Sequence, residues 1–478
     1  MRISRSVAVA GALACVAGAG GCATNPVTGQ RQLSLVSEAQ EIEMGRSQVP
    51  QVQQTMGFVA DAALQNYVSA IAMQMAKASE RPNLPWEFHV VDDAMINAFA
   101  APGGFIFVTR GMLVHMNSEA ELAGVLGHEI AHVTAKHSVA QMSTGLGAQL
   151  GVLAAAILTK SNTVAQGAGA IATIFTLKYG RDQESQADQL GHRYSLQQRY
   201  DVREMPNTFR TLQRVSAASG GGSGGPSFLS THPDPGDRIA KTQAWADTVT
   251  NTRGLIVDRD EYLTRINGLL YGPDPAEGYF ENGRFLHPPL QFQFDSPQGW
   301  LTANSKAAVT LGEPNGRAQI QLSGAQQASP DAAMQAFAQQ QGVQMGGSQR
   351  VTLGGSPGVI ADFTAASQDG QQLRGQVLYV QHSGSVFQFL GITTAQGWGS
   401  YGGIISGVLR SFRSTAANQV FQRARGIRVV TLSGNTSIAS LAGQSGGAIT
   451  AQQLAIMNGV ETNATLPSGR RVKTVVYR

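Results

Sequence analysis

Two histidines and a glutamate stand at helical spacing in the sequence His128-Glu129-Ile130-Ala131-His132. Side chains four residues apart share one face of a helix, so both imidazoles can bind one metal ion. Glu129 would then lie beside the coordination position that they leave open, where it can take a proton from a bound water. The pattern predicts the site of a hydrolytic zinc enzyme. The alternative is a helix that carries these residues by chance.

The residues around this motif have the pattern of a buried amphipathic helix. Small residues, Gly127 and Ala131, leave room for other groups to approach it closely. Apolar side chains recur at helical spacing at Leu122, Val125, Leu126, Ile130 and Val133. We therefore expect the motif to lie on one helix in the protein interior.

A third ligand is predicted further along the chain, at Glu184. Asp188 follows four residues later, so one helix would point both carboxylates at the same place. We expect Glu184 to bind the metal and Asp188 to accept the N–H of a ligand histidine, which would fix the tautomer of that histidine. Three protein ligands would leave the fourth position to water. The alternative is a polar helix face that makes surface ion pairs.

With these residues the chain resembles the zinc metallopeptidase (gluzincin) family that includes HtpX and the CAAX prenyl endoprotease. It is most similar to the periplasmic, BepA-like lipoprotein branch. The resemblance runs from about Asn25 to about Ile239 and rests on five ordered segments: 25–33, 96–106, 128–132, 184–188 and 230–239. Gln186 stands where many members have a second glutamate. This departure leaves the predicted ligand Glu184, and Asp188, in place.

The resemblance implies a substrate-binding role for Asn97 and Ala98. In related zinc peptidases an Asn-Ala pair on an edge strand hydrogen-bonds the substrate backbone. The segments 85–92 and 104–109 are rich in aromatic and β-branched residues and are predicted strands. An exposed sheet edge there would accept an extended peptide. The alternative for Asn97 is an ordinary turn residue.

His232 is a second candidate catalytic residue, with its role left open. It could donate to the oxyanion of the tetrahedral intermediate, or it could bind zinc in a closed form and displace the water. The glycine-rich stretch 217–227 precedes it and favours a gate. A third possibility is a histidine that merely adjoins Pro233. Other histidines fit no ligand spacing and are expected to be structural or surface residues: His115, His137, His192 and His382.

The N-terminus has the pattern of a lipoprotein signal peptide, residues 1–21. Arg2 and Arg5 precede an apolar segment at 7–19 that is too short for a permanent membrane span. The segment ends in Ala19-Gly-Gly-Cys22, which resembles a lipobox, so Cys22 is the predicted lipidation site. We expect a periplasmic protein anchored to the inner leaflet of the outer membrane. Ordinary secretion is the alternative.

The predicted fold class is α+β, with several domains. A mainly helical zincin-type metallopeptidase domain with a small edge-strand sheet (22–250) is followed by a linker (251–284), a small α+β domain (285–415) and a LysM-like βααβ module (425–478). The 478 residues, 42% of them hydrophobic, provide material for more than one core. The LysM resemblance implies peptidoglycan as a further candidate partner, although a degenerate copy that only packs on its neighbours is an equal alternative.

Two further features bear on partners. The formal net charge is +4 with no basic cluster, which disfavours nucleic acid. Residues 141–177 contain a single charge, Lys160, and we expect a buried or membrane-touching helical hairpin there, with a transmembrane pair as the alternative.

The resemblance implies a zinc-dependent endopeptidase of the bacterial cell envelope, with one Zn²⁺ per chain and Glu129 as general base. Its expected substrates are unfolded, misfolded or misassembled envelope proteins. Two other functions compete. A peptidoglycan-directed peptidase is disfavoured because the His-x-His signature usual in such zinc enzymes is absent. A catalytically silent, chaperone-like scaffold is disfavoured because Glu129 and the three ligands are present.

Overall fold

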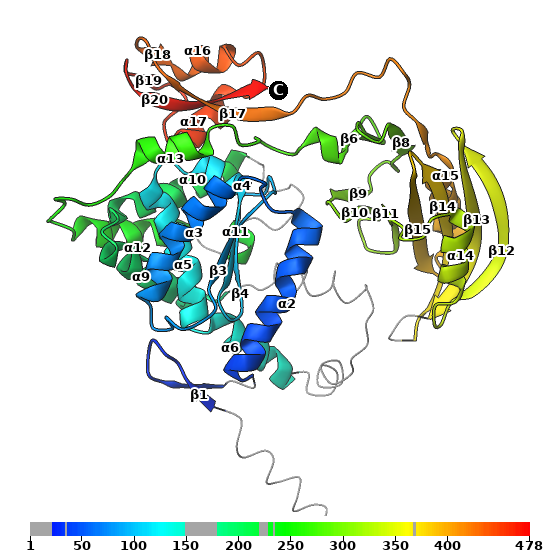
Figure 1. Cartoon of the computed structure of the whole chain (residues 1–478), viewed down its shortest axis with the longest axis horizontal. Coiled ribbons are helices and arrows are strands. Elements are labelled where there is room, and N and C mark those ends of the chain that lie inside the picture. Colours follow the sequence, from blue (N-terminus) through cyan, green and yellow to red (C-terminus); the bar gives the residue numbers. More distant parts are fainter. Residues whose placement is uncertain (1–21, 34–35, 149–178, 219–227, 233–234, 367–369) are drawn as a thin grey trace, which may run out of the picture. The chain divides into compact units, whose positions relative to one another are not determined.

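A computed structural model describes residues 22–33, 36–148, 179–218, 228–232, 235–366 and 370–478. The chain divides into two compact units. The first comprises residues 1–53, 57–272 and 425–477, and the second consists mainly of residues 273–424. Both units combine helices with sheets (Figure 1), so the predicted α+β class is confirmed.

A three-stranded sheet lies in the first unit, in the order β3-β5-β4. Its strands are β3 (Glu87–Val91), β4 (Ala98–Ala101) and β5 (Phe105–Thr109). β5 is parallel to β3 and antiparallel to β4. Every residue of β5 is buried, as its central place and aromatic and β-branched composition require. β4, which begins at Ala98, is an edge strand of this sheet.

The metal-motif helix is α5 (Glu119–Thr134), and it is buried on all sides. The Ser118 side chain caps its first turn by accepting the N–H of Glu121. A neighbouring helix, α9 (Arg181–Gln197), packs closely against it at two glycines. A Cβ atom at Gly127 would lie 3.0 Å from the Gly191 carbonyl oxygen, and one at Gly191 would lie 2.8 Å from the His128 nitrogen. The absence of both side chains lets the acidic residues of α9 approach the histidines of α5.

Long-range hydrogen bonds fasten the end of α5. Asn25 donates through Nδ2 to the Ala135 carbonyl at 3.1 Å. Arg81 donates through Nη1 to the Val133 carbonyl at 3.0 Å and to Glu41 Oε1 at 2.7 Å. Two of these contacts go to backbone carbonyls at the helix end, where carbonyls lack the full set of partners that the helix interior provides. They also hold the N-terminal segment against the metal-motif helix.

The remaining elements of the amino-terminal part surround this centre. They are β1 (Cys22–Thr24), β2 (Arg31–Leu33), α2 (Glu38–Met56), α3 (Ala62–Lys77), α4 (Arg110–His115), α6 (His137–Ala148), the 3₁₀ turn Val202–Glu204, α10 (Met205–Ala218), α11 (Phe228–Thr231), α12 (Pro235–Asp247) and α13 (Arg259–Ile266). The predicted linker 251–284 contains α13, whose Tyr262, Leu263 and Ile266 are fully buried in the core of the first unit.

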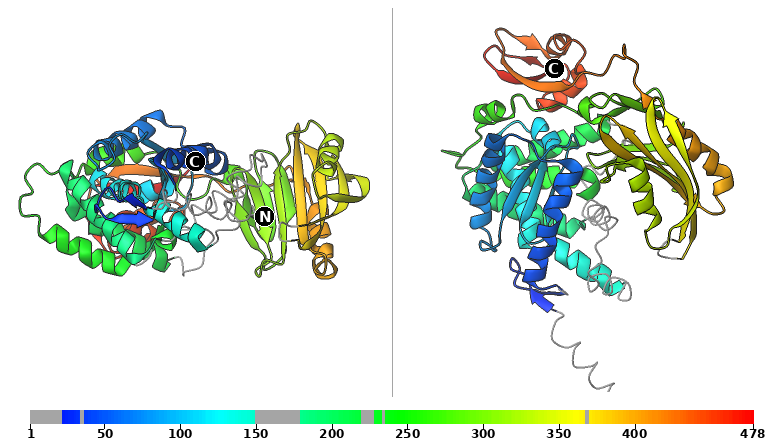
Figure 2. Two further views of the ribbon diagram at one scale, coloured as in Figure 1. Left: turned by 90° about the horizontal axis from the view of Figure 1, so that it is seen from below. Right: turned by 45° about the vertical axis from the view of Figure 1, so that its right-hand side comes forward.

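The C-terminal segment has the predicted order strand, helix, helix, strand. Its elements are β17 (Arg425–Thr431), β18 (Thr436–Ser437), α16 (Ile438–Gly443), α17 (Ala451–Met457), β19 (Thr465–Leu466) and β20 (Arg471–Tyr477), with β17 antiparallel to β20. Figure 2 shows it against the helices of the first unit, with which it shares one hydrophobic core. Lys473 is wholly buried and donates to the carbonyls of Val114 (3.0 Å) and Met116 (2.6 Å) at the end of α4. Glycan binding by this segment stays a prediction.

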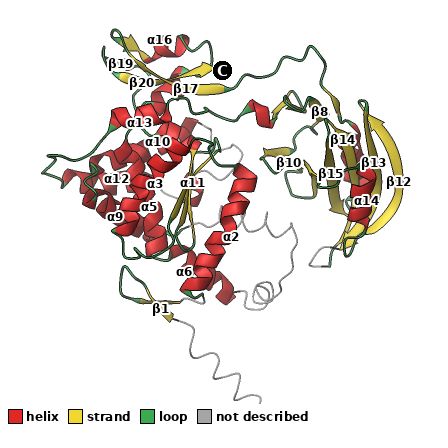
Figure 3. Ribbon diagram, viewed as in Figure 1, coloured by secondary structure: helices red, strands yellow, loops and turns green. Residues whose placement is uncertain are grey.

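The second unit is built on a seven-stranded antiparallel sheet (Figure 3), ordered β12-β13-β14-β15-β11-β10-β9. Successive side chains of a strand point to opposite faces of this sheet. Val359 of β13 packs with α14 (Pro330–Ala338) and Ile360 packs with α15 (Trp398–Arg410), so the two helices cover opposite faces. A smaller sheet has the order β16-β8-β7-β6. The elements are a 3₁₀ turn (Pro275–Glu277), β6 (Tyr279–Glu281), β7 (Arg284–His287), β8 (Phe292–Asp295), β9 (Leu301–Asn304), β10 (Ala308–Gly312), β11 (Ala318–Gly324), α14 (Pro330–Ala338), β12 (Gln344–Leu353), β13 (Ser356–Ala366), β14 (Gln372–His382), β15 (Ser385–Thr394), α15 (Trp398–Arg410) and β16 (Arg413–Ser414).

Two predicted membrane-related segments lie mostly outside the described residues. These are the signal peptide (1–21) and most of the hairpin (141–177), of which α6 includes the first part. Within the described ranges, no helix combines the length and apolar character needed to cross a bilayer.

Candidate metal centre

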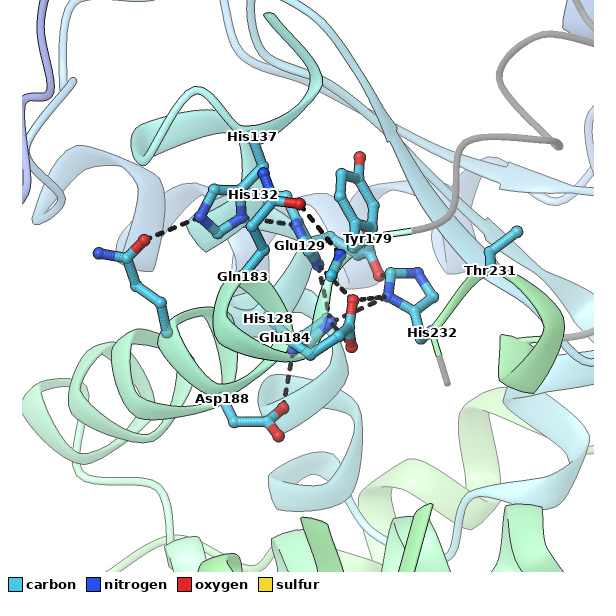
Figure 4. A network of polar contacts seen from close by, with 12 residues as sticks. His128, Glu129, His132, His137, Tyr179, Gln183, Glu184, Asp188, Thr231 and His232 are labelled. Carbon is cyan, nitrogen blue, oxygen red and sulfur yellow. Dashed lines mark hydrogen bonds and ion pairs between the residues drawn. The ribbon is translucent and has the colours of Figure 1, made fainter. Parts of the chain in front are cut away.

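Four side chains from three parts of the chain converge in the first unit (Figure 4). His128 and His132 come from α5, Glu184 from α9, and His232 directly follows α11. One ligand atom from each lies within 4.8 Å of the others, and all four residues are buried. His128 Nε2 lies 3.0 Å from His132 Nε2, and Glu184 Oε1 lies 3.5 Å from His132 Nε2. His232 Nδ1 lies 2.9 Å from Glu184 Oε1.

The tautomer of His128 fits a bound cation. His128 Nδ1 lies 2.9 Å from Asp188 Oδ1, so Nδ1 carries the hydrogen and Nε2 keeps a lone pair. That lone pair points toward His132 Nε2, 3.0 Å away. Two nitrogens bound to one tetrahedral zinc ion would lie about 3.3 Å apart, given Zn–N bonds of about 2.0–2.1 Å. The donor set therefore has the chemistry and the spacing for zinc.

Asp188 is itself held by a buried arginine that the sequence interpretation did not assign. Arg238 donates through Nε to Asp188 Oδ2 at 2.8 Å and through Nη2 to Oδ1 at 2.6 Å. Burial alone would raise the pKa of Asp188, but the Arg238 charge and the hydrogen bonds from His128 and Arg238 hold it well below its usual range. Asp188 therefore stays ionised and keeps accepting the His128 N–H. Arg238 lies within the segment 230–239, which marked the family resemblance, but the segment did not indicate this role.

Glu129 lies beside the ligand group without belonging to it. Its side chain is fully buried, and neither carboxylate oxygen has a hydrogen-bond partner among the residues the structure describes. His232 Nε2 lies 3.6 Å from Glu129 Oε1. Burial raises the pKa of Glu129, against the opposing effect of the neighbouring histidines. A buried carboxylate with a raised pKa that accepts no hydrogen bond is suited to accept a proton.

His137 lies next to the ligand group, which the sequence interpretation missed. Its side chain is buried, with Nδ1 2.9 Å from His132 Nδ1 and Nε2 2.8 Å from Gln186 Oε1. The expectation of a structural or surface residue was therefore incomplete. His137 follows His132 by five residues and begins a new helix, α6, so helical spacing could not indicate this contact.

Asn97 and Ala98 lie at the edge of the three-stranded sheet, outside the group of ligand residues. Asn97 is fully buried directly before β4, and Ala98 begins that strand. All four residues of β4 are buried, so this edge is not the exposed edge that the sequence predicted. Within the described ranges, the buried Asn97 Oδ1 has no hydrogen-bond partner.

The segment that carries His232 also contacts the sheet edge. The Phe228 N–H donates to the Ile96 carbonyl at 3.1 Å, and the Phe228 ring stacks on the His232 ring at 4.4 Å. Phe228 also lines a cavity beside His128 of about 10 Å³, together with Gly124, Val125, Met205, Thr208, Phe209 and Arg238. This volume is about that needed for one water molecule. A peptide side chain does not fit there while Phe228 is in place.

The buried group His128, His132 and Glu184 could hold a metal ion, with Glu129 beside it. Residues 62–246 match the family model for peptidase family M48. This part of the chain is therefore similar to that family.

The curated relatives agree with this assignment. The mitochondrial metalloendopeptidase OMA1 of Schizosaccharomyces pombe is 32% identical over 46% of this chain and 65% of its own length. A putative beta-barrel assembly-enhancing protease of Vibrio cholerae is 29% identical over 43% of each chain. The beta-barrel assembly-enhancing protease of Escherichia coli K12 is 26% identical over 55% of this chain and 53% of its own length. The chain thus spans 43% to 65% of the length of these relatives.

Proposed function

We propose that this protein is a zinc-dependent endopeptidase of the bacterial cell envelope that cleaves misfolded or misassembled envelope proteins. The observation that carries the proposal is the buried group His128, His132 and Glu184 beside the unpaired Glu129. The M48 match and the names of the relatives support proteolysis. The lipobox-like Cys22 and the name of the Escherichia coli relative support the envelope and its outer membrane as the place of action.

The chain's own residues divide the work of hydrolysis. His128, His132 and Glu184 would hold one Zn²⁺, which acts as a Lewis acid and makes a water nucleophilic at neutral pH. Glu129 takes the proton of the attacking water and returns it to the leaving amine. Asp188, held by Arg238, keeps His128 in the tautomer that leaves Nε2 free. Asn97 and Ala98 at the sheet edge would hydrogen-bond the substrate backbone.

His232 acts as a gate in this proposal. Its Nδ1 lies 3.2 Å from His128 Nε2 and 2.9 Å from Glu184 Oε1, within the group of ligand atoms. A fourth protein ligand would exclude the catalytic water from the metal. The small cavity beside Phe228 supports a closed form, in which a substrate strand must displace residues 228–232.

A peptidoglycan-directed peptidase is the second candidate, because the C-terminal segment has the βααβ order of a LysM-like module. Both candidate functions are tested by measuring zinc content, casein cleavage and muropeptide cleavage for the purified protein and for Glu129→Gln. Zinc-dependent casein cleavage that the variant lacks is the expected result. Cleavage of muropeptides alone would favour the peptidoglycan-directed peptidase. Zinc binding without any cleavage would favour a catalytically silent, chaperone-like scaffold.

A further inference from the structure

We propose that His137 and Gln186 form a hydrogen-bond relay that sets the tautomer of the metal ligand His132. The relay joins three helices: His132 is on α5, His137 begins α6, and Gln186 is on α9. Its two contacts are short, 2.9 Å between the Nδ1 atoms of the two histidines and 2.8 Å from His137 Nε2 to Gln186 Oε1. His132 and His137 are both buried, and Gln186 is half-buried at the outer end.

The relay has two possible directions, and only one of them serves a metal ligand. If Gln186 Oε1 accepts the His137 Nε2–H, then His137 Nδ1 has a lone pair and accepts the His132 Nδ1–H. His132 Nε2, which faces His128 Nε2 and Glu184, then keeps its lone pair for zinc. If the Gln186 amide turned over, its NH₂ would donate to His137 Nε2, and His137 Nδ1–H would donate to His132 Nδ1. The hydrogen of His132 would then be on Nε2, where the metal must bind.

The two α5 histidines are therefore oriented by different means. His128 donates directly to a carboxylate, Asp188, which can only accept. His132 donates to a neutral histidine whose direction depends on a glutamine, a side chain that can both donate and accept. A glutamate at position 186 would allow only the productive direction. Gln186 is consequently a positioning residue that acts on zinc through two intervening hydrogen bonds.

The proposal rests on the proposed function in one respect, that His132 binds zinc. It predicts opposite effects for two substitutions at position 186. Gln186→Leu removes the acceptor and should weaken zinc binding by about 10- to 100-fold, the usual effect of losing an outer hydrogen bond to a ligand. Gln186→Glu should bind zinc more tightly than the wild type.

Position 189 provides matched controls on the same helix, because Gln189 is exposed. Gln189→Leu should leave zinc affinity unchanged. Gln189→Glu measures how much an added negative charge by itself increases the affinity for zinc. The gain of Gln186→Glu should exceed that of Gln189→Glu.

The experiment combines zinc affinity, by competition with a chelator, with ¹⁵N-histidine NMR of the metal-free full chain. The spectra report which ring nitrogen of His132 carries the hydrogen. We expect Nδ1–H in the wild type and Gln186→Glu, and a mixture of tautomers in Gln186→Leu. Wild-type affinity in Gln186→Leu would overturn the proposal, as would weaker binding with an unchanged His132 tautomer. If Gln186→Leu fails to fold, an Nε2–H tautomer of His132 in the wild type or Gln186→Glu would still overturn it. If the wild type binds no zinc, the proposed function fails, while the tautomer measurement still tests the relay.

Discussion

Glu129→Gln separates the role of the base from that of the ligands. Both carboxylate oxygens of Glu129 are buried without a hydrogen-bond partner in the described part of the chain, and Glu129 is not one of the four grouped ligand residues. Glutamine has nearly the same shape but cannot take the proton of the attacking water. We expect peptide cleavage to fall by about 10²- to 10⁴-fold, the usual contribution of a general base, with zinc content unchanged.

The same substitution should stabilise the metal-free protein. Burial raises the pKa of Glu129 above that of an exposed glutamate, so the native state is penalised wherever the unfolded chain carries the ionised group. The penalty is absent near pH 4 and grows as the pH rises past about 4.3, where exposed glutamates ionise. Replacing a buried charge that accepts no hydrogen bond by a neutral amide should raise the free energy of unfolding by about 1–2 kcal/mol at pH 8. At pH 4 the two proteins should be equally stable.

Glu119→Gln is the matched control, on the first turn of the same helix. Its carboxylate accepts hydrogen bonds from Tyr67 (2.7 Å) and Tyr200 (2.8 Å), so the amide loses one acceptor and the protein should lose stability. Casein cleavage, metal analysis and urea unfolding at both pH values measure all three effects. Full activity of Glu129→Gln would refute the base assignment. Destabilisation as large as that of Glu119→Gln would refute the argument from its unpaired oxygens.

Four other substitutions test separate parts of the molecule. Glu184→Ala should lose both zinc and activity, and stoichiometric zinc in a folded variant would send the search for the third ligand elsewhere. His232→Ala should raise basal cleavage of an unstructured protein; a fall of about 10²-fold with zinc retained would make His232 an oxyanion donor instead. Cys22→Ser should release the protein from the membrane fraction on fractionation, and continued tight association would contradict lipid anchoring. Burial lowers the pKa of Lys473 to about 7 in the native state. Between pH 7 and pH 9 the Lys473 ammonium therefore loses its proton in the native state but keeps it in the unfolded state, and the free energy of unfolding should rise with pH. Lys473→Met should lack that rise in urea unfolding, and an undiminished rise would show that other groups cause it.

The spacing of the candidate ligands could be predicted from the sequence because each pair lies within one helix. His128 and His132, like Glu184 and Asp188, are four residues apart, and helical geometry alone puts each pair on one face. The strands predicted at 85–92 and 104–109 are present as β3 and β5, because aromatic and β-branched composition is also a local signal. Local periodicity carries that information.

Contacts between distant residues were decided by the tertiary structure alone. Arg238 reaches Asp188 from another helix, and Gln186 on α9 reaches His137 at the start of α6. The C-terminal segment reads as a separate module in the sequence, yet its apolar residues share the core of the peptidase unit and Lys473 donates to carbonyls at the end of α4. A buried polar side chain usually needs a hydrogen-bond partner, but the amino-acid sequence does not show which distant residue supplies it. Only the packing of elements that are distant in the sequence determines those partners.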